Sequence, residues 1–406
     1  MLAETFIRKL LRLKAHKVTR VEERDNDVMI YVDRLGSRLL SCGVCRRRCR
    51  KVHGRQKNIR RWRDLAMRDR RVVLVYQPYR VACPRCGVRV EDYPWAAPWA
   101  RVTKPLARAV VVLARQLSGS DTARHYHLNW KTVATLIRRT VDYGRRHRKR
   151  RPLHLLGIDE VSRRKGHNYM TVVYDLERRV LLWVGPERTV ETLDDFFRPL
   201  GRRRCATIRV VCMDMWKPYL RAVREHAPQA QILFDRFHLV RHLNHAVDEV
   251  RRSEVRRLTG EQKVAIKATR FLLLKNPWNM TIDEKERLST LVQWNMPVVR
   301  AYFLKEMFQM FWEYKQPARA EAHLRRWIYS AVRSRLKPFK AFVRLLRRHL
   351  DGVLAWTRVR ISNGAVEGMN NKIKLVSHRS FGFRGAKNYI AAIYHCCAQL
   401  PLPAET

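Results

Sequence analysis

The pattern of apolar residues between positions 153 and 234 constrains the fold of this chain more than any other feature. Three strand-like runs, separated by turn or charged residues, occupy residues 153–161, 169–176 and 180–184. After them, the periodicity alternates between helix and strand over residues 190–200, 207–213, 218–226 and 231–234. Three consecutive strands followed by alternating helices and strands predict an α/β core with helices packed on a sheet.

This order of elements is of the ribonuclease H-like kind, and it marks the segment as the candidate catalytic core. Asp159 lies in the first strand, in an apolar run where a carboxylate is costly unless it binds something. Asp214 ends the fourth strand, again after apolar residues. Each aspartate also has a purely structural explanation, because Asp159 can begin a turn with Glu160 and Asp214 can cap the next helix.

A third carboxylate lies far downstream, beyond a segment that is helical from residue 238 to about residue 356. Residues 362–374 predict a helix that Ser362 or Asn363 can cap, within a last helix or pair of helices over 362–397. At helical spacing one face of it carries Asn363, Glu367, Asn370 or Asn371, and Lys374. Such a polar face suits a site for metal and phosphate, although Glu367 taken alone is typical of an ordinary exposed residue.

Taken together, the three carboxylates are harder to explain as structural residues. Phosphodiester chemistry by two metal ions needs oxygen ligands that face each other across a metal separation of about 4 Å. A central strand, its neighbour and a covering helix supply such ligands. The sequence therefore predicts a metal site formed by Asp159, Asp214 and Glu367.

The charge of the chain points to a polyanionic partner. Its 406 residues, 46% of them hydrophobic, are enough for two or three packed domains, and 85 Lys and Arg against 36 Asp and Glu give a net charge of +49. Nucleic acid is the partner that this charge favours, although ribosomal and chromatin proteins share it. The apolar runs are too short to cross a membrane and the N-terminus has no signal-peptide pattern, so we expect a cytoplasmic protein, associated with the nucleoid when bound to DNA.

Two pairs of cysteines have the spacing of metal ligands. Each C-x-x-C motif can present two thiolates to a tetrahedral zinc ion, which predicts one structural zinc held by Cys42, Cys45, Cys83 and Cys86. The 37 residues between the motifs exceed the usual zinc-ribbon spacing, and Cys49 and His53 are alternative ligands. Two unrelated buried cysteine pairs are the structural alternative to this zinc-ribbon-like module.

The segment that follows reads as three helices. Residues 106–116 form the first, Ser118 to Asp121 break and cap the chain, and shorter and longer helices follow at 122–126 and 130–143. This is the order of a helix-turn-helix motif, whose last helix would bring Lys131, Arg138 and Arg139 to DNA; a plain three-helix unit is equally compatible with the pattern. Residues 145–151 are a basic run that serves as a linker or holds phosphates.

Several strings in the chain resemble the ISL-three type of bacterial insertion-sequence transposases over nearly the whole length. They are residues 157–162, 165–169, 214–219, 234–238 and 362–374. The resemblance implies the order of an N-terminal zinc finger, a helix-turn-helix and a DDE catalytic domain. It implies Asp159, Asp214 and Glu367 as the catalytic triad that binds Mg²⁺ or Mn²⁺, and a helical insertion between the second Asp and the Glu.

The implied boundaries divide the chain into five segments. These are a zinc-finger module at 1–100, a helix-turn-helix with a basic linker at 101–152, the first part of the catalytic core at 153–238, the helical insertion at 239–359, and the remainder of the core with its Glu at 360–406. Residues 235–238 also resemble a Cys/Asp-x-x-His motif of hAT-type and Mutator-like transposases. Accessory roles near the active site are therefore expected for Asp235, His238, Asn371 and Lys374, with a helix cap at Asp235 and a space-filling His238 beside Phe237 as the structural alternative.

The reaction that the resemblance implies uses two metal ions. Water attacks a phosphodiester at the element's end, and the freed 3′-hydroxyl then attacks target DNA in the same site. The zinc module and the helix-turn-helix would read the terminal inverted repeats, and pairing two ends requires a homodimer or a higher oligomer. Two other functions fit parts of the pattern: a DNA-binding regulator with a structural α/β domain, and a nuclease or junction resolvase that cuts without joining.

Overall fold

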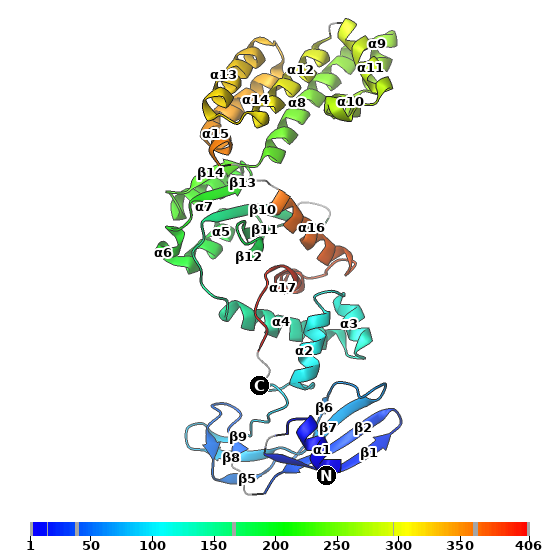
Figure 1. Cartoon of the computed structure of the whole chain (residues 1–406), viewed down its shortest axis with the longest axis vertical. Helices are drawn as coiled ribbons and strands as arrows, with labels where there is room; N and C mark the ends of the chain where they lie inside the picture. The colour runs from blue at the N-terminus through cyan, green and yellow to red at the C-terminus, as the bar shows by residue number, and fades with distance from the viewer. Residues whose placement is uncertain are drawn as a thin grey trace. The chain divides into compact units, whose positions relative to one another are not determined.

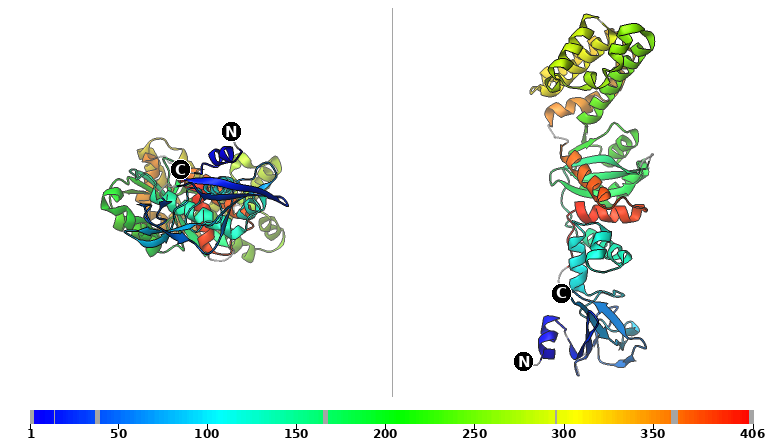
Figure 2. Two further views of the ribbon diagram at one scale, coloured as in Figure 1. Left: turned by 90° about the horizontal axis from the view of Figure 1, so that it is seen from below. Right: turned by 90° about the vertical axis from the view of Figure 1, so that its right-hand side faces the viewer.

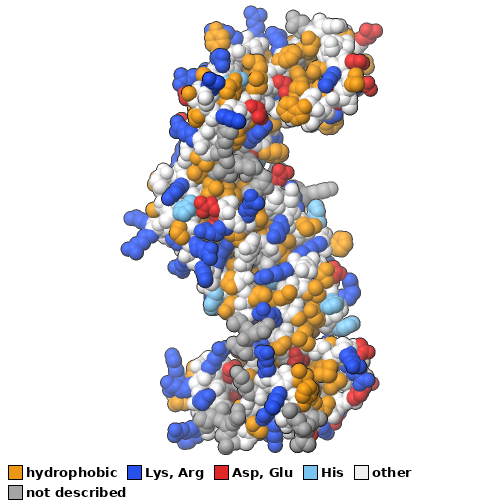
Figure 3. Space-filling view, viewed as in Figure 1, with side chains coloured by type: hydrophobic (Ala, Val, Ile, Leu, Met, Phe, Trp, Pro, Cys, Tyr) orange, Lys and Arg blue, Asp and Glu red, His pale blue; other side chains and the backbone are white. Residues whose placement is uncertain are grey.

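The computed structural model describes residues 3–13, 15–36, 40–164, 168–294, 296–359 and 364–403. Its chain forms two compact units (Figure 1). The first unit contains residues 1–148, 376–396 and 400–406, and the second contains residues 149–375 and 397–399. Lys and Arg side chains are spread over the visible face of both units (Figure 3).

The N-terminal part of the first unit is a β structure with a short helix, α1 (Ala3–Leu10). A four-stranded sheet has the order β1 (His16–Arg24), β2 (Asp27–Arg34), β7 (Arg71–Tyr76), β6 (Arg60–Arg63). Its core gathers the buried aromatic rings of Trp62, Tyr76 and Trp95. Two smaller sheets, which carry the cysteines, consist of β3 (Leu40–Ser41) with β4 (Arg48–Cys49), and β5 (Val52–Arg55) with β8 (Tyr79–Cys83) and β9 (Gly87–Val90).

Three helices follow in the order that the sequence predicts. They are α2 (Lys104–Leu113), α3 (Gly119–His125) and α4 (Trp130–Arg146). Each begins at a residue whose side-chain oxygen accepts a hydrogen bond from a backbone N–H of the first turn: Thr103, Ser118 and Asn129. Ser118 is the N-cap residue of α3, so the helix starts at Gly119, three residues before the start predicted at residue 122.

The C-terminal helix α17 (Ala386–Cys397) belongs to this helical group. His395, which is buried, places its Nε2 2.7 Å from the carbonyl oxygen of Val111 in α2. Arg115 donates a hydrogen bond to the carbonyl of Leu400, and a Cβ added at Gly144 of α4 would lie 2.6 Å from the Leu400 Cβ. The predicted segment 360–406 is thus divided between the two units.

The second unit is built on a five-stranded sheet of order β12-β11-β10-β13-β14. The first three strands of the sheet in sequence pair with one another in antiparallel fashion. They are β10 (Leu155–Arg164), β11 (Asn168–Asp175) and β12 (Val180–Pro186). β13 (Val210–Met213) and β14 (Gln231–Phe234) extend the sheet in parallel from β10. β13 is shorter than predicted because residues 206–208 close turns onto Arg202, Arg204 and Cys205.

Helices alternate with these strands. They are α5 (Val190–Phe197), the 3-10 helix η1 (Arg198–Leu200), α6 (Gly201–Cys205) and α7 (Lys217–His226). Leu193, Phe197 and Val223 bury apolar side chains in the same core as Ile158 and Val211 of the sheet. The consecutive strands and then alternating helices and strands are those predicted from hydrophobic periodicity.

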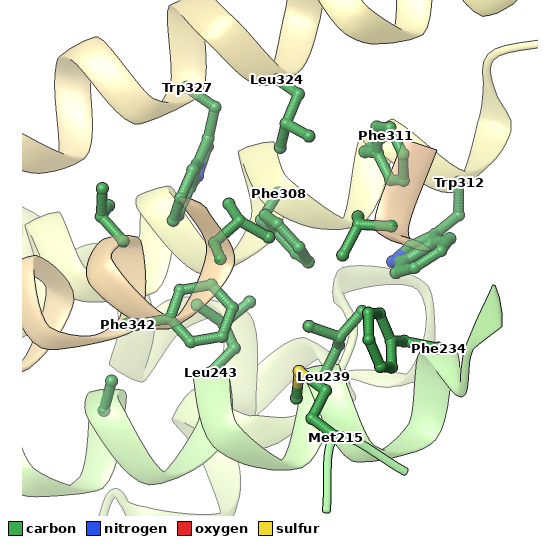
Figure 4. Packing of buried hydrophobic residues seen from close by; sticks show 14 of the residues in the cluster. Met215, Phe234, Leu239, Leu243, Phe308, Phe311, Trp312, Leu324, Trp327 and Phe342 are labelled. Carbon is green, nitrogen blue, oxygen red and sulfur yellow. The ribbon is translucent and has the colours of Figure 1, made fainter. Parts of the chain in front are cut away.

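Between residues 236 and 358, the part of the chain that the structure describes contains helices and their connections, without strands. They are α8 (Arg236–Arg257), α9 (Gly260–Lys267), α10 (Arg270–Leu274), η2 (Pro277–Asn279), α11 (Ile282–Gln293), α12 (Pro297–Gln309), η3 (Met310–Glu313), α13 (Pro317–Arg333), α14 (Lys337–Arg348) and α15 (Leu350–Arg358). Their core is aromatic: Phe308 packs against Trp312, Trp327 and Phe342 (Figure 4). α15 returns to β14, where Gly352 is so close to Phe234 that an added Cβ would lie 2.3 Å from the ring.

After α15 the chain forms α16 (Gly364–His378). Figure 2 shows this helix beside the five-stranded sheet. The predicted capping residues Ser362 and Asn363 lie outside the described residues, as do Lys165, Gly166 and His167 of the β10–β11 connection.

Candidate active site and metal centre

The two predicted aspartates lie on adjacent inner strands of the sheet, near the carboxyl end of β13. β10 and β13 pair in parallel with Gly157 opposite Cys212, so that Asp159 and Asp214 each follow two residues further along their strands. The Oδ1 of Asp159 accepts a hydrogen bond from the backbone N–H of Glu160 at 2.8 Å, and the Oδ1 of Asp214 accepts one from Met215 at 2.6 Å. The parallel register therefore brings these two carboxylates to one place, as the sequence predicts for adjacent strands.

His238 lies among three aspartates at this end of β13. Its Nδ1 is 3.3 Å from Oδ2 of Asp214, and its Nε2 is 3.9 Å from Oδ1 of Asp159 and 3.8 Å from Oδ2 of Asp235. The imidazole is buried, with 10% of its side chain exposed. His238 is thus within reach of both candidate metal ligands, which a space-filling histidine beside Phe237 would not require.

Asp235 begins the helix that carries His238. Its Oδ1 accepts a hydrogen bond from the backbone N–H of Phe237 at 2.6 Å, so it caps α8 as the structural alternative expects. Its other oxygen faces His238. Capping and a place at the candidate site are therefore compatible in the same residue.

α16 reaches the site through Asn370. The Nδ2 of Asn370 donates a hydrogen bond to Oδ2 of Asp159 at 2.6 Å, and the Tyr174 hydroxyl donates one to Oδ1 of Asn370 at 2.6 Å. Tyr174 is fully buried in β11. Tyr174, Asn370 and Asp159 therefore form a chain of hydrogen bonds that fixes the amide orientation and the carboxylate together.

The remaining predicted residues of α16 are exposed. Glu367 lies one turn before Asn370, and Lys374 lies one turn after it, which is the spacing of residues on one helix face. Asn371, the asparagine chosen from the sequence, is exposed, whereas its neighbour Asn370 contacts Asp159. Helical spacing alone admits both asparagines, and only the hydrogen bond to β10 separates them.

Burial dominates the electrostatics of the site, and hydrogen bonds and the nearby His238 oppose its effect on Asp159 and Asp235. Burial raises the pKa of Asp159 above its ordinary value, and burial raises the pKa of Asp235 too, with Asp159 and Asp214 adding to it. Carboxylates in this condition favour a bound cation. Glu160 forms an ion pair with Arg188, whose Nη1 lies 3.0 Å from its Oε2 and whose guanidinium lies over Tyr169 and Trp216.

The four cysteines predicted to bind zinc converge, as the sequence predicts. Among the residues that the structure describes, Cys42, Cys45, Cys83 and Cys86 are the group of potential ligands whose atoms all lie within 4.8 Å of one another. The sulfurs of Cys45 and Cys83 are 3.5 Å apart. Four thiolates around zinc are separated by about 3.8 Å when each Zn–S bond is about 2.3 Å, so this cluster fits a tetrahedral zinc ion.

The surroundings act on the thiols of the cluster in opposite directions: the hydrogen bond with Cys45 raises the pKa of Cys86 to about 12, whereas the pKa of Cys83 is lowered. Burial opposes ionisation of Cys83, yet hydrogen bonds from the backbone N–H groups of Arg85 and Cys86 outweigh it and lower the pKa of this thiol to about 6. Cys49 is buried next to the cluster with its sulfur directed to the Arg47 carbonyl, and His53 is exposed. Neither is in the group, so the set preferred from the sequence is the one that the fold assembles.

The three predicted DNA contacts of α4 have different surroundings. Lys131 and Arg139 are exposed. Arg138 is half-buried, and its guanidinium donates hydrogen bonds to Asn388 of α17 at 3.0 Å and to Thr135 at 3.1 Å. Arg138 therefore joins α4 to the C-terminal helix, whereas Lys131 and Arg139 have side chains accessible to DNA.

A three-helix unit with an exposed basic helix, and a sheet with paired aspartates, together define a DNA-binding protein with a carboxylate site. Comparison with known proteins identifies the family. Residues 91–141 match the helix-turn-helix domain of transposase family ISL3, and residues 156–393 match the ISL3 DDE domain described as transposase. The chain belongs to the ISL3 family of transposases.

Two relatives are transposases of insertion elements. The transposase for insertion sequence element IS1001 of Bordetella parapertussis is 34% identical over 361 residues, which cover 88% of both chains. The transposase for insertion sequence element IS1557 of Mycobacterium tuberculosis is 30% identical over 377 residues, covering 87% of this chain and 84% of the relative. Within the described part of the chain, no helix has the length and apolar character needed to cross a membrane.

Proposed function

We propose that this transposase binds the terminal inverted repeats of an insertion sequence, cleaves the DNA at the element's ends and joins the 3′-hydroxyl ends to target DNA. The observation that carries the proposal is the pairing of Asp159 and Asp214 on adjacent parallel strands, with His238 between them. The strand order β12-β11-β10-β13-β14, antiparallel and then parallel, supports a ribonuclease H-like core. The helices from Arg236 to Arg358 are then an insertion within that core.

Asp159, Asp214 and Glu367 are proposed to hold two Mg²⁺ or Mn²⁺ ions. Carboxylate oxygens are the ligands that these ions prefer, and the raised pKa of Asp159 indicates a carboxylate whose charge is poorly compensated by its surroundings. When bound, the ions lower the pKa of the attacking water or hydroxyl and stabilise the leaving oxygen.

The neighbouring residues of the chain position these ligands. Asn370, itself oriented by Tyr174, holds one oxygen of Asp159 and leaves the other toward His238. His238 orients Asp214 and Asp235. Lys374 and Asn371, exposed on the same helix as Glu367, are proposed to contact the phosphates of the bound strand.

DNA recognition is proposed for the first unit. One zinc ion held by the four cysteines would stabilise the N-terminal module, and Lys131 and Arg139 of α4 would contact the major groove. Pairing two element ends requires at least two copies of the chain, so a homodimer or higher oligomer on DNA is part of the proposal. Its site of action is proposed to be the cytoplasm, on the nucleoid.

A single assay tests this function against its two alternatives. Purified protein is incubated with a labelled duplex that carries an end of the element encoding it, together with a target plasmid, with Mg²⁺ or with chelator. The proposal predicts end cleavage and strand transfer in Mg²⁺ and neither in chelator. Binding without cleavage would favour a regulator, and cleavage without joining would favour a nuclease.

A further inference from the structure

The chain makes an unusual turn at the end of α16. The backbone N–H of Gly382 donates a hydrogen bond to the carbonyl oxygen of Ser377 at 2.9 Å, and the backbone N–H of Phe381 donates one to the carbonyl oxygen of His378 at 3.0 Å. This pair of hydrogen bonds defines a Schellman motif. The residue at the left-handed position of this motif is usually glycine, but here it is Phe381 with φ +50°. The sequence therefore places a bulky side chain where the backbone favours none.

The Phe381 ring is also fully solvent-exposed, at 100% of its reference area. The strained backbone opposes folding stability, and the exposed ring gains no burial that could offset the strain. Strain of this kind is concentrated at binding sites, where another interaction compensates for it. The side chain is thus a candidate contact for a partner.

Anchors on both sides hold this turn on the helix-turn-helix. Arg379, just before it, donates hydrogen bonds to the carbonyls of Arg115 at 2.8 Å and Gln116 at 2.9 Å, directly after α2. On the other side, Asn388 accepts the hydrogen bond from Arg138 of α4. The turn is therefore fixed next to both the α2–α3 junction and the candidate recognition helix, all within the first unit.

The charge around the turn identifies the kind of partner. From Gly368 to Ala404 the sequence contains no Asp or Glu, and it contains five Lys or Arg. His378, Arg384 and Lys387, which flank Phe381, are exposed. This basic surface fits a polyanion. Because the neighbouring helix-turn-helix domain is of a DNA-binding kind, we take the polyanion to be duplex DNA.

We propose that the turn from Arg379 to Arg384 is a second DNA contact, in which Phe381 inserts between base pairs from the minor groove while Arg384 and Lys387 hold the adjacent phosphates. Apolar wedges flanked by cations act in this way in proteins that bend DNA through the minor groove. The proposal rests on the proposed function, since it assumes that the helix-turn-helix binds the element's ends.

The experiment compares the full-length protein with Phe381→Gly and Phe381→Leu. Glycine suits φ +50°, so Phe381→Gly is expected to fold at least as stably as the unchanged protein, and thermal unfolding checks this. The matched control is Trp99→Gly, because Trp99 is an aromatic residue that is 83% exposed and has φ +61°. It likewise replaces an exposed aromatic side chain with glycine at another left-handed position of the first unit.

The DNA probe is a duplex carrying the element's end, with 2-aminopurine placed in turn at each adenine, beside a scrambled duplex. Binding of the unchanged protein should raise the fluorescence at one base step, since insertion of a ring unstacks the bases. Phe381→Gly should lose this signal and bind about tenfold more weakly, as expected for the loss of one stacking contact. Phe381→Leu should keep part of the signal, and Trp99→Gly should keep both signal and affinity.

Unchanged affinity and fluorescence in Phe381→Gly would overturn the inference while the proposed function stands. An equal loss in Trp99→Gly would overturn it as well, because the effect would not be specific to the turn. If the unchanged protein does not prefer the end duplex to the scrambled one, the proposed function and the inference both fail.

Discussion

The four thiols of the cysteine cluster all lie within 4.8 Å of one another, whereas the aspartates of the candidate active site are linked through His238 over 3.3 to 3.9 Å. Two short knuckles on neighbouring small sheets bring the thiols together. The carboxylates come from β10, β13 and the start of α8, and they repel one another. Backbone geometry thus builds the first site, whereas the second depends on groups that counter its negative charge.

The largest effect is expected at the carboxylates. Asp159→Asn, Asp214→Asn or Glu367→Gln removes one charge with little change of shape, and each should lower cleavage and strand transfer by about a thousandfold or more. Binding of end duplex should remain within a few-fold, because these groups are proposed to hold metal rather than DNA. Quantified cleavage and joining products, with a gel-shift assay beside them, check this. Near-normal strand transfer in any one mutant would remove that residue from the triad.

The next largest effect is expected at the cysteine cluster. Cys83→Ser combined with Cys86→Ser should abolish zinc binding, unfold the N-terminal module and weaken end binding by about tenfold or more, because structural zinc contributes directly to folding. Metal analysis and circular dichroism measure the loss. Cys49→Ala is the matched control, since Cys49 is buried beside the cluster but is outside it. Stoichiometric zinc in the double mutant would contradict the assignment.

A smaller effect is expected from the residues that orient Asp159. Asn370→Ala and Tyr174→Phe should lower cleavage by about ten- to a hundredfold and raise the Mg²⁺ concentration needed for half-maximal rate, as loss of a metal ligand's supporting hydrogen bond does. Leu375→Ala, at an exposed position of the same helix that has no proposed role at the site, serves as the control and should change neither quantity by more than a few-fold. Equal effects in Asn370→Ala and Leu375→Ala would show that the hydrogen bond has no specific role.

The smallest effect is expected at His395, a buried residue of the first unit that belongs to neither candidate metal site. Burial lowers the pKa of His395 from 6.5 to about 4, so the folded state keeps this ring neutral while the unfolded chain takes up a proton. Stability should therefore fall as pH decreases from about 6.5 to about 4, by roughly 3 kcal/mol. Denaturant titrations across this range should show the slope in the unchanged protein and a flatter profile in His395→Gln. A slope of the same size in both would exclude His395 as its source.

The same contrast explains what the sequence could predict. The cysteine set follows from spacing, and β14 matches the predicted 231–234 run residue for residue. Asp159 and Asp214 stand out because carboxylates are rare in apolar strands. Asn370 could not be separated from Asn371, because its role comes from a hydrogen bond to a residue 211 positions away.

The C-terminal segment was harder to predict for the same reason. Periodicity indicates helices over 362–397, and α16 and α17 are there. Nothing in that periodicity shows that Arg379 bonds to carbonyls more than 260 residues earlier, or that Arg138 is occupied by Asn388. Contacts of this length depend on the packed fold rather than on local pattern.

The central claim is that Asp214 binds a catalytic metal ion, and a change of metal preference tests it most directly. Asp214→Cys replaces an oxygen ligand with sulfur, which Mg²⁺ binds poorly and Mn²⁺ binds better. The account predicts that strand transfer by this variant is lost in Mg²⁺ and partly restored in Mn²⁺, while Asp214→Ala stays inactive with both ions. Equal activity of Asp214→Cys in the two metals, or activity of Asp214→Ala in Mg²⁺, would contradict it.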